Sequence, residues 1–417
     1  MDNEPLLDTT TPAQLRRLAK ELQQALASNQ GARALHPDDP ARFVDSEVAL
    51  DEKIHLVQPV SVASALCDEL AASSIPRTLA EIIAGHENDD IVADAVAVIA
   101  EWTDADVTSE TFLTRGLQEG NIVTAIVTRL GDESCSSHAA MLPVLEAALE
   151  ADDKLVPPPA LLPFLLANVE ALPTASDVLV LLVPRLAADA RASVVDPCLA
   201  LLAKQRRADD DGTLSREDAE VVLNLLDVLV LVPPSSGEAM ALLLRLVRDR
   251  SRFGPRALAV LDAMLDGNGS EPAVAFVQAM GLKTLFALLM GKGKHVGKYS
   301  EEHIVGILHM LVHGLPKDSV ERARLVHKFR EADFCKLERI YELQRELTAR
   351  VSEAAVDEEE ENDEEAVLLA EVAAGRLTLD KVDEILDRLT GEHRSIAKRL
   401  AMLKAKFEEA PEDEVRE

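Results

Sequence analysis

The sequence predicts an all-α protein in which thin layers of helices stack along the chain as a solenoid. Apolar residues make up 47% of the 417 residues, whereas aromatic residues make up only 3%. This composition suits repeated thin layers better than one thick core. Helix-length segments alternate with short breaks that contain glycine or proline, and no useful stretch alternates apolar and polar residues as a strand would.

The first predicted helix covers residues 11–28. Thr11 is a suitable N-cap residue, and Pro12 occupies the first helical position. One apolar side recurs at helical spacing through Leu15, Leu18, Leu22 and Leu26. A polar, proline-containing connection follows, so residues 1–45 are predicted to form an N-terminal helix and a linker.

The segment His86–Asp106 predicts a helix that packs along one side. Asn88 is a suitable N-cap, and the aspartates that follow it lie in the first turn, where the helix dipole favours negative charge. The apolar side comprises Ile91, Ala95, Ile99 and Trp102. Trp102 is therefore predicted to lie in the core rather than at an exposed partner contact.

Three carboxylates, Glu101, Asp104 and Asp106, gather at the far end of this helix. The dipole disfavours negative charge there, so helix stability does not explain them. Two interpretations remain open: they contact a basic partner, or they shape the turn between repeats.

Residues 46–351 are predicted to form a solenoid of the armadillo or HEAT kind, whose repeat is about 40–47 residues. The sequence similarity between units is weak, so the number of repeats is left open. The predicted breaks are Gly85–His86, Gly131–Asp132, Pro157–Pro159, Pro233–Pro234, Gly267–Gly269 and Gly314–Pro316.

The end of the chain is predicted to hold an acidic linker and a helical cap. Asp357–Glu365 carries eight carboxylates, so residues 352–365 are expected to be a solvated, mobile linker or an insertion. Residues 366–390 and 392–408 resume helical periodicity within a C-terminal part, 366–417, that ends in an acidic tail. These helices are expected to cap the solenoid, since a terminal repeat must cover its apolar face. Self-association is the alternative.

The formal charge of −31 extends well beyond the acidic run. Such a surface repels phosphate backbones and anionic membranes, which argues against broad nucleic-acid or lipid binding and favours basic protein partners. An ordinary solubilising surface is the alternative interpretation. The N-terminus has no secretory pattern, and the longest apolar segment, 221–232, is too short for a bilayer span. An intracellular protein is expected.

Cysteine spacing predicts neither a metal site nor disulfides. Cys67, Cys135, Cys198 and Cys335 are far apart in the chain, and this spacing matches no zinc or redox motif. Reduced thiols, mostly in the core, are expected.

His309 and His313 form an H-x-x-x-H pair on one face of a predicted helix. Zinc binds such pairs, but Met310 stands where a zincin has its glutamate base, and no third ligand follows at a suitable spacing. The sequence therefore predicts solvent-facing histidines and no metal site.

The segment Gly291–Lys298 carries a dense basic patch in this acidic chain, made by Lys292, Lys294, Lys298 and His295. It is not a nucleotide loop, because the glycine spacing differs and Tyr299 occupies the Ser/Thr position. Either an ordinary mobile connection or a contact with RNA or an acidic partner fits the pattern. No nucleophile elbow, Cys/His pair or dinucleotide loop is present, so we expect neither catalysis nor a cofactor.

Six segments that occur in order carry a family resemblance. They are RFVDSEVALDEKI (42–54), the stretch 86–106, RALAVLDAML (256–265), FVQAMGLKTLFALLMGK (276–292), EEHIVGIL (301–308) and LVHKFREADFCKLERIYEL (325–343). Together they resemble the beta-catenin-like protein 1 family. The resemblance covers most of residues 42–410, is diffuse between about 140 and 250, and is absent from the first thirty-odd residues. The residues of 86–106 that match the family pattern are His86, Glu87, Asn88, Asp90, Glu101, Thr103, Asp104 and Asp106.

The resemblance implies a nuclear armadillo-repeat scaffold associated with the nineteen complex of the spliceosome, in pre-mRNA splicing. It further implies that the chain binds basic segments of the nuclear-localisation type, including one of the Myb-domain subunit. One feature departs from the family: residues 1–40 hold only Arg16, Arg17, Lys20 and Arg33 as basic residues, so entry into the nucleus with a partner is the alternative to an own signal. An import adapter or a cytoplasmic assembly scaffold with another basic client is the alternative function.

Overall fold

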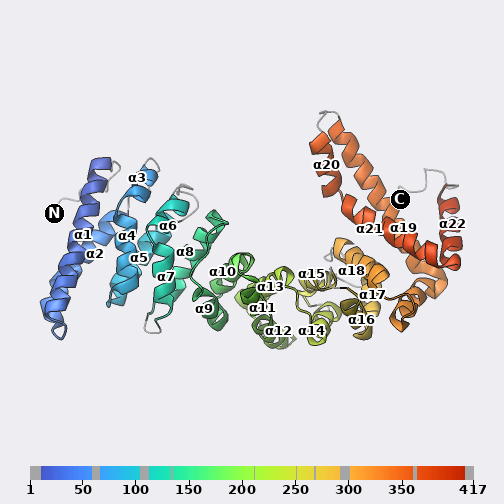
Figure 1. Ribbon diagram of the computed structural model, residues 1–417, viewed down its shortest axis with the longest axis horizontal. Coiled ribbons are helices and arrows are strands. Elements are labelled where there is room, and N and C mark those ends of the chain that lie inside the picture. Colours follow the sequence, from blue (N-terminus) through green and yellow to red (C-terminus); the bar gives the residue numbers. More distant parts are fainter. Residues whose placement is uncertain are drawn as a thin grey trace. The chain divides into compact units, whose positions relative to one another are not determined.

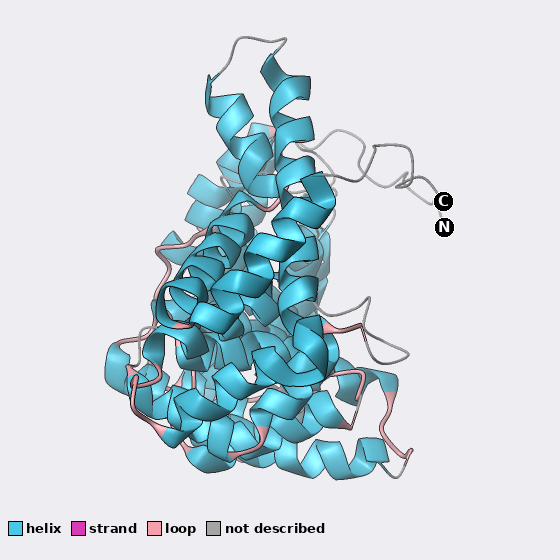
Figure 2. Cartoon of the chain, turned by 90° about the vertical axis from the view of Figure 1, so that its right-hand side faces the viewer, coloured by secondary structure: helices cyan, strands magenta, loops and turns pink. Residues whose placement is uncertain are grey.

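The computed structural model describes residues 11–58, 66–103, 112–132, 135–210, 212–249, 251–266, 269–291, 301–359 and 364–408. Within these ranges every regular element is a helix (Figure 1, Figure 2), which confirms the predicted all-α class. The chain divides into two compact units. Unit 1 comprises residues 1–197 and 215–228, and unit 2 comprises residues 198–214 and 229–417.

Unit 1 stacks its long helices in two rows. The first row contains α1 (Pro12–Leu35), α4 (Ile75–Gly85), α7 (Ile122–Leu130) and α9 (Leu161–Asn168). The second row contains α2 (Val44–Val57), α5 (Asp89–Trp102), α8 (His138–Ala151) and α10 (Thr174–Leu182). Each helix packs on its neighbours within its row, as the layers of a solenoid do.

Shorter elements connect these rows. They are η1 (Pro40–Arg42), α3 (Cys67–Ala72), the π-helical turn η4 (Phe112–Gly116), α6 (Leu117–Glu119), η5 (Val183–Arg185) and α11 (Ala188–Ala192). Helix α13 (Arg216–Leu231) belongs mostly to unit 1.

Local residues explain where the first helices begin and end. Thr11 and Gln14 form a reciprocal capping box at the start of α1, as its sequence predicts. The helix continues past the predicted end at residue 28 to Leu35. It ends at His36, since the residue before Pro37 is sterically kept out of the helical region.

Helix α5 confirms the pattern of the segment 86–106. The Asn88 side chain accepts a hydrogen bond from the backbone N–H of Asp90 at 3.0 Å. The predicted apolar side is buried, and Trp102 is 1% exposed. Its ring meets Phe112 edge-on at 5.6 Å between centroids, and its Nε1–H donates to the carbonyl oxygen of Gln58 at 3.2 Å. Trp102 therefore lies in the core, as predicted.

Unit 2 also contains two rows. One consists of α15 (Gly254–Leu265), α18 (Glu301–Gly314) and α21 (Arg376–Glu392), and the other of α14 (Gly237–Arg248), α17 (Gly281–Leu289) and α19 (Val320–Glu359). The remaining helices are α12 (Val195–Asp210, mostly in this unit), α16 (Ser270–Gln278), α20 (Glu364–Ala373) and α22 (Arg394–Glu408). The predicted breaks fall between helices or at their last residues, except that Gly267 and Asn268 of the break Gly267–Gly269 lie outside the described residues.

Helix α19 is two helices joined at a sharp break. Glu331 leaves the helical region at ψ 148°, and Ala332, Asp333 and Phe334 are left-handed with φ between 51° and 65°. Three consecutive left-handed non-glycine residues are unusual. Glu331 anchors the break, because Lys328 and Lys336 donate to its carboxylate at 2.9 and 2.6 Å. These two hydrogen bonds, that of Lys336 first, lower the pKa of Glu331 to about 2.

The C-terminal helices differ in detail from the prediction. The segment 366–390 forms two helices rather than one, because the chain turns at Gly375, whose φ of +104° suits glycine. Helix α19 extends to Glu359, into the segment predicted to be an acidic linker, and α20 begins at Glu364. Helices α21 and α22 pack on each other and on α19.

All four cysteines are free thiols, and three are buried: Cys67, Cys135 and Cys198. Burial raises the pKa of the Cys198 thiol to about 12. The expectation that the cysteines lie mostly in the core is confirmed. No single described helix is long and apolar enough to cross a membrane. Helices α16 and α17, which meet at a bend of 87°, reach the necessary length and apolar composition only when they are taken together.

Candidate functional site

The outer side of α5 carries carboxylates at helical spacing. Positions 90, 94, 97 and 101 are exposed or half-buried, whereas the opposite side of the helix is buried. Asp90, Asp94 and Glu101 occupy three of these four positions. Since residues three and four apart share a helix face, the carboxylates form one line along α5.

Neighbouring helices of the second row continue this line. Asp51 of α2 lies beside Asp94, and Asp177 of α10 lies near Glu146 of α8; each pair repels electrostatically. We give the name acidic stripe to six of these carboxylates, without Asp90 in the first turn of α5: they are Asp51, Asp94, Glu101, Glu146, Glu150 and Asp177. Helix packing within the second row places its members on successive layers.

The first row of unit 1 has a different surface. The outward positions of α1 carry Arg16, Arg17 and Lys20, those of α4 carry Arg77 and Glu81, and those of α7 carry two threonines. The carboxylates that lack a cationic partner therefore concentrate on one of the two rows rather than covering unit 1 evenly.

No described lysine or arginine forms an ion pair with a member of the acidic stripe. The partners of the stripe are neutral or weakly basic: Gln58 donates to Glu101, Asn224 donates to Asp177 at 2.6 Å, and His55 lies 3.5 Å from Asp51. Three carboxylates elsewhere in unit 1 are, by contrast, paired with cations: Glu21 with Lys53, Glu47 with Arg33 and Asp89 with Arg129. The negative charge of the stripe is left available to a ligand.

The environment of the stripe disfavours ionisation of two members. Burial raises the pKa of Asp94, and the hydrogen-bonded carboxyl of Asp51 adds to the effect. Burial also raises the pKa of Glu146, with further contributions from the charges of Asp177 and Glu150. A cationic group placed on the stripe would favour the ionised form of Asp94 and Glu146, because an opposite charge lowers the pKa of a carboxyl group.

The variant Asp94→Asn is expected to be at least as stable as the parent chain at pH 7. A raised pKa in the folded chain means that the carboxyl contributes stability below its unfolded pKa of about 3.9, and this contribution is lost as the pH rises through the folded value. Urea unfolding at pH 7 and pH 4 measures the difference in unfolding free energy between Asp94→Asn and the parent chain. This difference should be smaller at pH 4. Asp89→Asn, which breaks the pair with Arg129, should instead destabilise the chain.

Of the residues that the sequence singled out, only part lies in the described chain. Glu101 is exposed and belongs to the acidic stripe. Asp104 and Asp106 lie outside the described residues, as do Lys292, Lys294, His295 and Lys298. Their proposed contacts with a basic partner, with RNA or with an acidic partner therefore stay predictions.

His86, one of the family-pattern positions, has a structural role. It is 5% exposed, its Nδ1 accepts the Asn88 backbone N–H at 3.1 Å, and its Nε2 lies 3.1 Å from Asn29 Oδ1. We assign the proton to Nε2, since Nδ1 is the acceptor. Burial lowers the pKa of His86, so the neutral ring links α1 to the start of α5.

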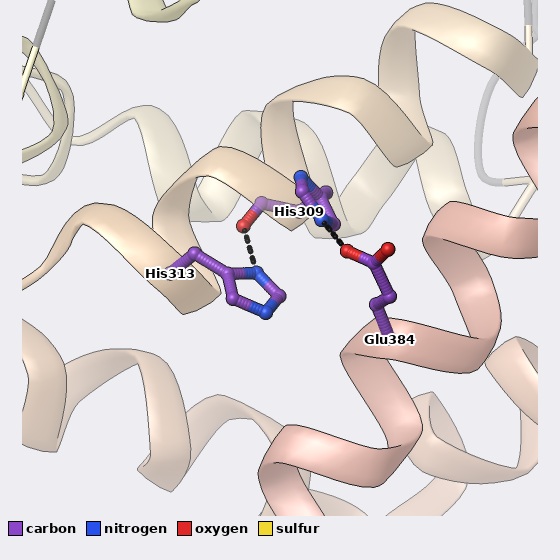
Figure 3. A group of neighbouring side chains, drawn as sticks. All are labelled: His309, His313 and Glu384. Atoms are coloured by element: carbon purple, nitrogen blue, oxygen red, sulfur yellow. Dashed lines mark hydrogen bonds and ion pairs between the residues drawn. The ribbon is translucent and has the colours of Figure 1, made fainter. Parts of the chain in front are cut away.

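The sequence showed no third metal ligand at a suitable spacing from His309 and His313, but the structure places one beside them. Glu384 of α21 lies against them (Figure 3). The expectation that both histidines face solvent is wrong for His309, whose side chain is only 18% exposed and lies 2.6 Å from the Glu384 carboxylate. Asp51, His55 and Asp94 form a second group of potential ligands in the described residues.

Sequence reasoning missed the acidic stripe because carboxylates are abundant in this chain, with 74 in all. Their alignment depends on which helices share a row. Because the similarity between repeats is weak, the sequence does not show which helices these are. The detectable signal was the pattern on α5, where acidic residues recur at three- and four-residue spacing opposite the apolar side.

Comparison with known proteins agrees with the resemblance inferred from the six segments. The chain is 27% identical to the beta-catenin-like protein 1 homolog of Schizosaccharomyces pombe over 366 residues, which cover 80% of this chain and 64% of the relative. It is 30% identical to beta-catenin-like protein 1 of Bos taurus and 29% identical to that of Homo sapiens, over 355 residues in each case, 76% of this chain and 62% of the relative. The chain thus spans less than two thirds of the length of these relatives.

A sequence model of the catenin-beta-like, Arm-motif containing nuclear family matches residues 1–416. The helical rows of both units agree with an armadillo-type architecture. The chain belongs to the catenin-beta-like family of armadillo-motif proteins, which is described as nuclear.

Proposed function

We propose that the chain is a nuclear, non-catalytic scaffold of pre-mRNA splicing, which associates with the nineteen complex and binds basic segments of splicing factors along the acidic stripe. The observation that carries the proposal is a row of six carboxylates without a lysine or arginine partner in the described chain. Membership of a nuclear armadillo-motif family supports the location and the scaffold role.

The stripe suits an extended peptide of the nuclear-localisation type. Lysine and arginine side chains of such a peptide reach successive helices of the second row and form charge-assisted hydrogen bonds with the carboxylates. Binding also offsets the repulsion between Asp51 and Asp94 and between Glu146 and Asp177. The Myb-domain subunit of the nineteen complex is the first client that we propose, and entry into the nucleus with this client compensates for the few basic residues at 1–40.

Binding of a lysine- and arginine-rich peptide should depend strongly on salt. We expect its Kd to rise by at least about tenfold when NaCl increases from about 50 to about 300 mM, because salt shortens the range over which exposed charges attract. Fluorescence anisotropy with a labelled basic peptide measures this change. Binding that is insensitive to salt would contradict an electrostatic surface.

Crosslinking and mass spectrometry of the endogenous assembly tests the cellular role. The proposal predicts crosslinks between nineteen-complex proteins and lysines near the second row of unit 1, such as Lys53 of α2 and Lys154 after α8. Recovery of import receptors without splicing proteins would overturn it and support an import adapter instead. Recovery of a cytoplasmic assembly alone would also overturn it.

A further inference from the structure

Helices α18 and α21 of unit 2 bring three potential metal ligands together. His309 and His313 lie one turn apart on α18, and Glu384 lies on α21, 75 residues after His309 in the chain. One ligand atom from each of the three lies within 4.8 Å of the others. In Figure 3 both imidazole rings and the carboxylate gather between the two helices.

The hydrogen bonds of the cluster orient its donors. His313 Nδ1 lies 3.0 Å from the backbone carbonyl oxygen of His309. A carbonyl only accepts, so Nδ1 carries the proton and Nε2 keeps its lone pair. A backbone carbonyl holding the second ring nitrogen is the usual support of a metal-binding histidine.

The remaining two groups are joined by a hydrogen bond in which His309 Nε2–H donates to the Glu384 carboxylate, so His309 Nε2 must give up this proton before it can bind a cation. His309 Nε2 faces Glu384 Oε2 at 2.6 Å, and the rings of the two histidines lie 4.3 Å apart between centroids.

The donor set selects the kind of cation. Two imidazole nitrogens and one carboxylate oxygen suit Zn²⁺ and related divalent transition metals rather than Mg²⁺ or Ca²⁺, which prefer oxygen ligands. Tetrahedral Zn²⁺ with bonds of about 2.0–2.1 Å separates its ligand atoms by about 3.3 Å. His309 Nε2 and Glu384 Oε2 are closer than this, at 2.6 Å, and the three ligand atoms lie within 4.8 Å of one another. Rotation of the two exposed side chains, His313 and Glu384, would bring the three atoms to tetrahedral spacing.

We propose that His309, His313 and Glu384 form a Zn²⁺ site that joins α21 to α18. Three protein ligands leave the fourth tetrahedral position to water, since His313 and Glu384 are exposed. The bound cation replaces the hydrogen bond between His309 and Glu384, and His309 releases its Nε2 proton to solvent, with the neutral ring then protonated on Nδ1. It links α21 to α18, the preceding helix of the same row, through a contact that spans 75 residues of chain, and it thereby stabilises unit 2.

Titration of the full chain without an affinity tag tests the site, with Zn²⁺ measured by chelator competition and Co²⁺ by its visible absorption. We expect one equivalent to bind with a Kd at or below about 1 µM and the Tm to rise by at least about 3 °C. The variants His313→Ala and Glu384→Gln should each weaken binding at least about tenfold. Both side chains are exposed, so neither substitution threatens folding.

The variant His55→Ala is the matched control, because it removes a histidine from the second group, Asp51, His55 and Asp94. This variant should leave the affinity for Zn²⁺ and the visible spectrum of bound Co²⁺ unchanged. Loss of binding in His55→Ala but not in His313→Ala would overturn the proposal. A Kd of about 100 µM or weaker in the parent chain would overturn it as well.

Discussion

Replacing Asp94 and Glu146 together by lysine is expected to weaken binding of a basic peptide by at least about a hundredfold at low salt. The change removes two carboxylates that have no described cationic partner and places two positive charges opposite those of the peptide. Each tenfold loss corresponds to about 1.4 kcal/mol, and like charges at an interface cost several kcal/mol. Fluorescence anisotropy of a labelled peptide gives the Kd of each variant.

A charge-matched control separates the stripe from net charge. The double variant Glu81→Lys/Glu271→Lys changes the formal charge by the same amount at exposed positions outside the stripe. Its Kd should rise by less than about threefold, because isolated surface charges contribute little. Equal losses in the two double variants would mean that the global charge of −31, rather than the stripe, attracts the peptide.

Local sequence signals predicted the helices well where their determinants lie within one or two turns. Thr11 and Asn88 cap α1 and α5 through contacts with residues two or three positions away. The apolar side that ends in Trp102 is buried as its spacing predicts. Such contacts follow from helix geometry alone, so they need no knowledge of neighbouring helices.

Features that depend on stacking could not be predicted. Glu384 meets His309 across 75 residues, and Asp94 meets Asp51 only because α5 packs on α2. The break of α19 at Glu331–Phe334 contains neither glycine nor proline, so no local signal marks it. Besides the local pairs of Glu331 with Lys328 and Lys336, the break has a contact from later in the chain, between Arg399 of α22 and Asp333.

Removing the Glu392 carboxylate is expected to destabilise unit 2 by about 3–5 kcal/mol, because it leaves a buried guanidinium without its counter-charge. Arg322 of α19 is 3% exposed, and its Nη2 lies 2.7 Å from Glu392 Oε2 at the end of α21. Its Nη1 donates to the carbonyl oxygen of Val312 in α18. One side chain thus links three helices. Urea unfolding of Glu392→Ala, followed by circular dichroism, measures the loss.

The pH dependence of this pair provides an independent check. Burial opposes ionisation of Glu392, but the hydrogen bond and charge of Arg322, with the charges of Arg388 and Lys317, outweigh it and lower the pKa. A lowered pKa contributes stability above the unfolded value of about 4.3, and this contribution is lost as the pH falls through the folded value.

The stability difference between the parent chain and Glu392→Gln should therefore be full at pH 7 and shrink below about pH 4. Arg388→Ala removes a more accessible, half-buried partner of the same carboxylate, 38% exposed against 3% for Arg322, and should cost less than about 1 kcal/mol. If Arg388→Ala and Glu392→Ala had equal effects, the buried charge of Arg322 would not be the origin of the loss. The double replacement Arg322→Met/Glu392→Leu should recover most of it, because two apolar side chains leave no charge to compensate.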